Sequence, residues 1–110
     1  MQSHGDIQNL IKGLSSKFMI DKIILFGSQA SNDATDNSDI DICIIADVSE
    51  RRKFLKQLRL YIYDKYSGLN FNKPVDIIFY TPDDWAKNFN KSGTFANLIA
   101  KEGVFLYGRQ

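Results

Sequence analysis

Two acidic residues, Asp39 and Asp41, follow a Gly27-Ser28 pair after a spacer of ten residues. Asp41 belongs to an apolar run that predicts a strand over residues 40–46, and side chains two positions apart on a strand share one face. Two carboxylates on one face repel each other unless a cation neutralises them or one of them keeps its proton. Magnesium is usually held by one or two carboxylates together with substrate phosphate oxygens, so the pair is a candidate metal site.

The Gly27-Ser28 pair is a candidate phosphate-binding turn. The apolar run over residues 22–26 predicts a strand, which Gly27 would end by letting the backbone turn closely. Amides freed in such a turn can bind an anion, and Ser38, directly before the acids, joins Gly27 and Ser28 in the candidate nucleotide-binding set. An Asp-x-Asp motif alone is common by chance, however, and also fits an ordinary charge at a strand edge.

A third acid, Asp76, occurs near the start of another apolar run, and this run predicts a strand over residues 75–80. On that strand Asp76 shares a face with Ile78 and Tyr80. If this strand is the neighbour of the strand that carries Asp41, at a spacing of about 4.8 Å, three carboxylates meet at one end of the sheet. Such a set can hold two metal ions about 3.5–4 Å apart. The alternative is a half-exposed acid at a strand edge.

Helices and a fourth strand must position these residues. Apolar residues at helical spacing predict a helix over residues 6–18, and another over 49–66 with Ser49 as its N-cap. Thr81 followed by Pro82 predicts a helix start, residues 94–102 predict a further helix ended by Gly103, and residues 104–107 predict a last short strand. The early part of residues 29–38 is a candidate short helix. This order of elements predicts one α/β unit.

Length and composition restrict the class of protein. With 110 residues the chain has room for one domain, residues 1–110, with a modest core. Its formal net charge of +1 lacks the positive field of a dedicated nucleic-acid binder, so nucleic acid is not an expected direct partner. The single cysteine, Cys43, predicts a buried thiol in a reducing compartment. With no apolar stretch of membrane-spanning length and no secretory signal, a cytoplasmic protein without membrane contact is expected.

Taken together, the motifs resemble those of the minimal nucleotidyltransferases of the DNA polymerase β superfamily. The shared pattern is Phe26-Gly27-Ser28, the ten-residue spacer, Ser38-Asp39-Ile40-Asp41-Ile42 and the later Val75-Asp76-Ile77. This spacing is similar to that of the antitoxin branch, and residues 101–108 are similar to the way such proteins end. The ordered set is far more specific than either motif alone. The resemblance implies a polymerase-β-like palm, an α/β (α+β) fold with a small mixed β-sheet and helices packed mainly on one face.

The resemblance also implies an activity, cofactors and a partner. The activity would be transfer of a nucleoside monophosphate, AMP from ATP, to a hydroxyl of a partner protein, with Mg²⁺ or Mn²⁺ held by Asp39, Asp41 and Asp76 as catalytic residues. The partner would be a HEPN-type all-helical toxin in a hetero-oligomer, silenced by modification of a tyrosine. For docking, Tyr63 and Trp85 are candidate exposed aromatic anchors. One departure stands out: many relatives have a basic residue where this chain has Gln29.

Two other functions remain open. A nucleotidyltransferase could instead modify a small hydroxylated molecule, although the relatives of that kind resemble longer chains. A neutralising interaction module could bind its toxin without transferring anything, and Gln29 is the reason to consider it. The three acids favour chemistry, because a pure binding module does not need them.

Overall fold

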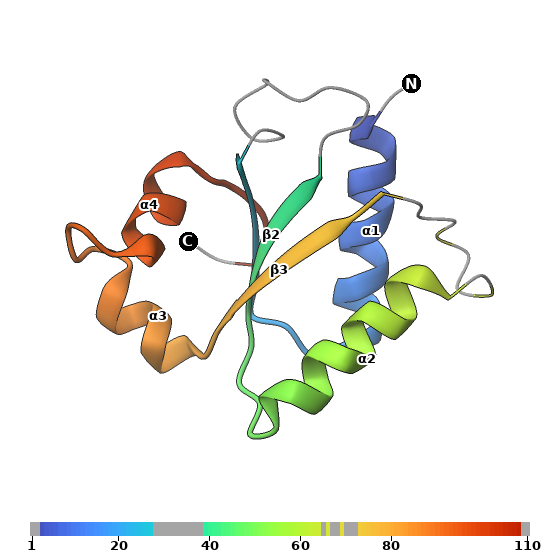
Figure 1. Cartoon of the computed structure of the whole chain (residues 1–110), viewed down its shortest axis with the longest axis horizontal. Helices are drawn as coiled ribbons and strands as arrows, with labels where there is room; N and C mark the ends of the chain where they lie inside the picture. The colour runs from blue at the N-terminus through green and yellow to red at the C-terminus, as the bar shows by residue number, and fades with distance from the viewer. Residues whose placement is uncertain (1–2, 28–38, 65, 67–68, 70–72, 109–110) are drawn as a thin grey trace. The chain divides into compact units, whose positions relative to one another are not determined.

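The order of helices and strands follows from a computed structural model, which describes residues 3–27, 39–64, 66, 69 and 73–108 (Figure 1). In chain order the elements are α1 (Ser3–Lys17), β1 (Lys22–Phe26), β2 (Ile40–Ile45), α2 (Arg51–Tyr63), β3 (Val75–Tyr80), α3 (Pro82–Asn88), α4 (Phe95–Glu102) and β4 (Val104–Gly108). Contacts divide the chain into a helical unit, residues 1–19 and 48–72, and a sheet unit, residues 20–47 and 73–110. The organisation as one domain stays a prediction.

The sheet is mixed and has the strand order β3-β2-β1-β4. Strand β1 is antiparallel to both β2 and β4, while β2 and β3 run parallel. A parallel pair needs a long connection, and the segment that contains α2 supplies it. The predicted mixed sheet and the α+β fold class are confirmed. The predicted bounds of β1 and β3 are also confirmed, and β2 and β4 each differ from prediction by one residue.

One face of the sheet packs against α3 and α4, which lie on the same side of it in Figure 1. The buried cluster on this face is made of Ile24, Cys43, Ile45, Trp85, Ala96 and Ile99. Cys43 is fully buried, as predicted, and burial raises the pKa of its thiol to about 12, so the thiol stays protonated. Trp85 is only 6% exposed, so the prediction that it is an exposed anchor is wrong. Its indole is buried because it packs between the rings of Tyr80 and Phe89, with centroids 5.6 and 5.9 Å away.

The start of α3 follows the predicted Thr81 cap, and α4 begins after a Thr94 cap that the sequence analysis did not predict. The Thr81 hydroxyl accepts a hydrogen bond from the Asp84 amide at 3.1 Å, and the Thr94 hydroxyl accepts one from the Asn97 amide at 3.0 Å. Each bond satisfies one of the amides that a helix start leaves without a partner inside the helix. After α4, Gly103 leads into β4, and a Cβ there would lie 2.5 Å from the Ile24 side chain, so only glycine fits this close approach.

Helix α2 is shorter than predicted at both ends. It begins at Arg51 after Glu50, whose side chain makes no capping hydrogen bond, so the predicted Ser49 cap is wrong. It ends at Tyr63 because Asp64 is extended and its carboxylate accepts a hydrogen bond from the Tyr66 amide at 2.9 Å. This local turn competes with the helix for the backbone. Helix α1, predicted over residues 6–18, extends over Ser3–Lys17.

An aromatic cluster packs within the helical unit. The Phe18 ring, directly after α1, makes edge-to-face contacts with the rings of Phe54 and Tyr61 on α2, at centroid distances of 5.9 and 5.7 Å. Such pairs contribute beyond the area that they bury, typically about 0.5–1.5 kcal/mol each. None of the helices in the described part of the chain has the length and apolar character needed to cross a bilayer.

Candidate active site

The parallel pairing of β2 and β3 places two of the predicted acids directly opposite each other. Asp41 is the register partner of Asp76, and on the other side of β2 it is the partner of Phe26 on β1. Residues directly opposite on neighbouring strands share a face. Phe26, Asp41 and Asp76 therefore form a row across three strands, on the sheet face that α3 and α4 cover further along. The two acidic strands are neighbours, which was the condition for bringing these acids together.

The carboxyl groups interact, and the interaction is unfavourable when all of them are ionised. The pKa of Asp41 is raised above its ordinary value, first by partial burial, then by the negative charge of Asp76, a hydrogen bond with Asp76 and the charge of Asp39. Asp41 is half-buried, whereas Asp39 and Asp76 are exposed. Burial and the neighbouring acids thus make ionisation of the Asp41 carboxyl less favourable than in water. A proton, or a cation in its place, relieves the repulsion.

Gly27 ends β1 directly beside this cluster and has a φ of +74°, a value that favours glycine. A Cβ at Gly27 would collide with the Asp41 carboxylate. This backbone conformation at Gly27 fits the close turn predicted there, and the missing side chain leaves room for the acid. Ser28, Gln29 and Ser38 lie outside the described residues, so their predicted roles stay predictions.

The donor set fits a divalent cation of the hard, oxygen-binding kind. Carboxylate oxygens are the ligands that Mg²⁺ and Mn²⁺ prefer, and bringing a cation between Asp41 and Asp76 would remove the repulsion that raises the Asp41 pKa. Among the described residues, no group of three or more His, Cys, Asp or Glu side chains is arranged as a ready-made metal site. The assignment of Asp39, Asp41 and Asp76 as metal ligands stays a prediction.

One residue near the cluster was missed by the sequence analysis. Phe95, at the start of α4, packs edge-to-face on Phe26 with ring centroids 5.8 Å apart, yet it is 47% exposed. The sequence gives no signal that separates Phe95 from the buried residues of its helix, because Phe95 and Leu98 are apolar like Ala96 and Ile99, which the core buries.

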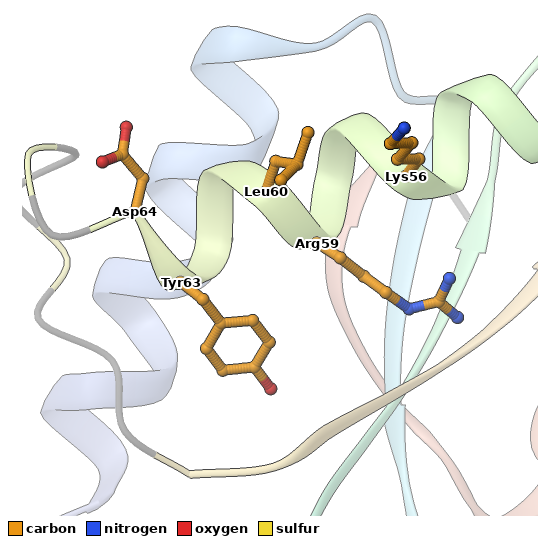
Figure 2. Close-up of a pocket in the computed structure, with 5 residues that line it drawn as sticks. All are labelled: Lys56, Arg59, Leu60, Tyr63 and Asp64. Atoms are coloured by element: carbon orange, nitrogen blue, oxygen red, sulfur yellow. The ribbon is translucent and has the colours of Figure 1, made fainter.

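A groove of about 570 Å³ in the helical unit has a different character (Figure 2). It is lined by Lys56, Arg59, Leu60, Tyr63 and Asp64, all on α2 or directly after it. Figure 2 shows Arg59 and Tyr63 leaving one side of the helix and Lys56 and Leu60 leaving another. Among the described residues that line it, cations and apolar groups predominate and Asp64 is the one carboxylate, so they offer no pair of acids for metal chemistry.

Three comparisons with known proteins bear on the family of this chain. A family model described as a nucleotidyltransferase domain matches residues 7–101. A protein of Methanocaldococcus jannaschii, named as a candidate protein adenylyltransferase, is 48% identical over 97% of this chain and 100% of its own length. A crystal structure of a candidate nucleotidyltransferase from Sulfolobus solfataricus matches with a TM-score of 0.56 and 21% identity, over 96% of this chain and 79% of that one.

The last likeness shows the fold alone, whereas the family model and the archaeal relative each cover most of the sequence. The matched region contains Gly27, Asp39, Asp41 and Asp76, the residues that the sheet gathers at one end. The chain belongs to the nucleotidyltransferase domain family.

Proposed function

We propose that this chain transfers AMP from ATP to a hydroxyl group of another protein. The observation that carries the proposal is the pairing of Asp41 with Asp76 at one strand end, beside the positive-φ turn at Gly27. The relative named for protein adenylyl transfer supports both the nucleotide and the class of acceptor, because its identity of 48% extends over nearly the whole chain.

The chemistry would be an in-line displacement at the α-phosphorus of the triphosphate. The acceptor oxygen forms a bond to this phosphorus, the bond to the pyrophosphate oxygen breaks, and pyrophosphate leaves with the bonding electrons. Asp76, which is exposed, would take the proton of the attacking hydroxyl. Amides at the Gly27 turn, with Ser28, would bind the outer phosphates. Divalent ions held by Asp39, Asp41 and Asp76 would neutralise the phosphates and lower the pKa of the hydroxyl.

The acceptor that we propose is a HEPN-type helical toxin, which forms a hetero-oligomer with this chain and is silenced by the AMP group. Support comes from α2, which carries five basic residues, Arg51, Arg52, Lys53, Lys56 and Arg59, and no acid. Between the last two cations and the helix end, Leu60 and Tyr63 are 62% and 48% exposed. Apolar groups flanked by charges are typical of protein interfaces, so this face fits an acidic partner surface with an apolar centre.

One assay tests the proposal. The protein is incubated with Mg²⁺ or Mn²⁺, the product of the neighbouring gene, and ATP labelled either at the α-phosphate or at the γ-phosphate. We expect label on the neighbour from α-labelled ATP alone, and its loss when Asp39 and Asp41 are replaced by Ala. Transfer of the γ-label would indicate a kinase. Tight binding of the neighbour without any label would instead support a neutralising module, and label on a small hydroxylated molecule alone would identify that alternative acceptor.

A further inference from the structure

An aromatic surface begins directly beside the acidic cluster. Phe26 is the register partner of Asp41, and the backbones of paired strands lie roughly 4.8 Å apart. Phe95 packs edge-to-face on Phe26 at a centroid distance of 5.8 Å. An aromatic pair therefore adjoins the acids on this face of the sheet.

Two apolar side chains of this surface are exposed to solvent. Phe95 is 47% exposed and Leu98 is 46% exposed, while Ala96 and Ile99 of the same helix are buried in the core. Both exposed side chains line a surface groove of about 580 Å³, a size within the range of small-molecule sites. Exposed apolar area is unfavourable in water, and packing in the core of the sheet unit does not require Phe95 and Leu98 to be exposed.

The segment that carries Phe95 is tied in place. The Thr94 hydroxyl donates to the carbonyl oxygen of Asn88 at 2.8 Å, and it accepts from the Asn97 amide at 3.0 Å. The Asn97 side-chain amide donates to the carbonyl oxygen of Phe89 at 2.9 Å. These bonds fix the start of α4 against the preceding turn, so little order would have to be gained when a flat ligand binds.

We propose that Phe95, with Leu98 beside it, forms the surface on which the nucleobase of the triphosphate stacks. The inference rests on the proposed function, because it needs a nucleotide whose phosphates lie at the acids and Gly27. A base attached to those phosphates must lie to one side of the acidic cluster, and the Phe26–Phe95 side offers an aromatic face. Every base has a π-face, so stacking of this kind tolerates different bases.

The test compares ATP with inorganic triphosphate, which has the phosphates and lacks the base. Calorimetric titration gives the Kd of each for the wild-type chain and for Phe95→Ala, Phe95→Leu and Phe95→Trp. Phe95→Ala should weaken ATP binding roughly 5- to 100-fold and leave triphosphate binding unchanged. Phe95→Leu keeps apolar packing on Phe26 but should still weaken ATP binding, because it removes the aromatic ring. Phe95→Trp keeps an aromatic ring and should bind ATP about as tightly as the wild type does. Val104→Ala, at another exposed apolar position of the sheet unit, is the matched control.

The outcomes separate the two proposals. If the wild-type chain binds ATP and triphosphate while Phe95→Ala and Phe95→Leu bind ATP as the wild type does, the stacking surface is overturned and the proposed function stands. Equal loss of ATP and triphosphate binding in Phe95→Leu also overturns it, since the residue would then act through the phosphates or the fold. A wild-type chain that binds neither ligand, with either metal, overturns the proposed function and the stacking surface together.

Discussion

The acidic strand ends of the sheet unit and the basic helix of the helical unit both gather like charges, but they do so at different cost. Asp41 and Asp76 are held opposite each other by strand register, and the half-buried Asp41 cannot move away from its neighbour. Lys56 and Arg59 are long, exposed side chains that water and salt screen. The acidic cluster therefore calls for a bound proton or cation, whereas the basic face can remain in solvent until a partner binds.

The first turns of α3 and α2 also differ in the sign of their charges. Helix α3 has Asp83 and Asp84 in its first turn, where the helix dipole favours acids, and a threonine cap before them. Helix α2 has only basic residues in its first turn and no capping side chain. Charges placed against the local preference indicate a role other than stability.

Substituting Gly27 should affect the acidic cluster most. In Gly27→Ala the new Cβ collides with the Asp41 carboxylate, and a displaced catalytic group can lower a rate by up to about 100-fold. The strained φ should also cost about 1–2 kcal/mol of stability. Gly93→Ala is the matched control, because its φ is +90° but a Cβ there meets nothing within 4 Å. Transfer of α-label and chemical denaturation measure the two effects. Equal transfer by both variants would contradict the account.

Reversing charge on α2 should weaken the partner complex and leave nucleotide binding intact. We expect Lys56→Glu with Arg59→Glu to slow association with the acceptor roughly 10-fold at low salt, and the difference from the wild type to shrink as salt rises. Lys87→Glu with Lys91→Glu makes the same change of charge at exposed positions of the sheet unit. Surface plasmon resonance over a salt series gives the rates. If the two double variants are slowed alike, net charge and not the α2 face explains the effect.

Removing the charge of Asp41 should stabilise the protein at neutral pH. The pKa of Asp41 is raised in the folded state, so the wild type loses stability as pH rises from the unfolded-state pKa through the folded-state pKa. Asp41→Asn has no charge to lose at this position, so its Tm should be a few degrees higher than that of the wild type at neutral pH. At about pH 3.5 the two Tm values should differ little. Mg²⁺ should raise the Tm of the wild type more than that of the variant. A Tm of Asp41→Asn below that of the wild type at neutral pH would show that the charge of Asp41 does not destabilise the fold.

The smallest effects are expected at the helix starts. Lys53→Glu in the first turn of α2 should raise the free energy of unfolding by about 0.3–1 kcal/mol, because an acid there matches the helix dipole. Asp83→Lys in the first turn of α3 should lower it by a similar amount. Urea denaturation at low salt measures both. Changes of the same sign in the two variants would show that the dipole does not set the difference between these helices.

The sequence predicted the parts of the fold that depend on local pattern. The alternation of residues around Asp41 and Asp76 placed both acids on strands in the correct phase, and the Thr81 cap follows from residue type alone. Predictions from the sequence were wrong where a contact with another residue decides the local structure. Trp85 is buried partly by the ring of Tyr80 on β3, and α2 stops early because the Asp64 carboxylate accepts a hydrogen bond from the Tyr66 amide.

Some residues of the candidate site could be predicted from the sequence and others could not. The acids could be found from the sequence because their types and spacing are unusual within apolar strands. Phe95 could not, since its contact with Phe26 joins residues far apart in the chain and its exposure depends on how α4 packs. The strand order that puts β2 beside β3 was an assumption in the sequence analysis and is a finding of the structure.

The most direct test of the account is a double-mutant cycle on the paired acids. Transfer of label from α-labelled ATP to the acceptor is measured for Asp41→Asn, Asp76→Asn, the double variant and Asp47→Asn, an exposed acid of the sheet unit outside the cluster. If Asp41 and Asp76 act as one catalytic unit, each single change should lower transfer about 100-fold or more, and the double variant should be little worse than either. Transfer at the wild-type rate by Asp76→Asn, or an equal loss in Asp47→Asn, would contradict the account.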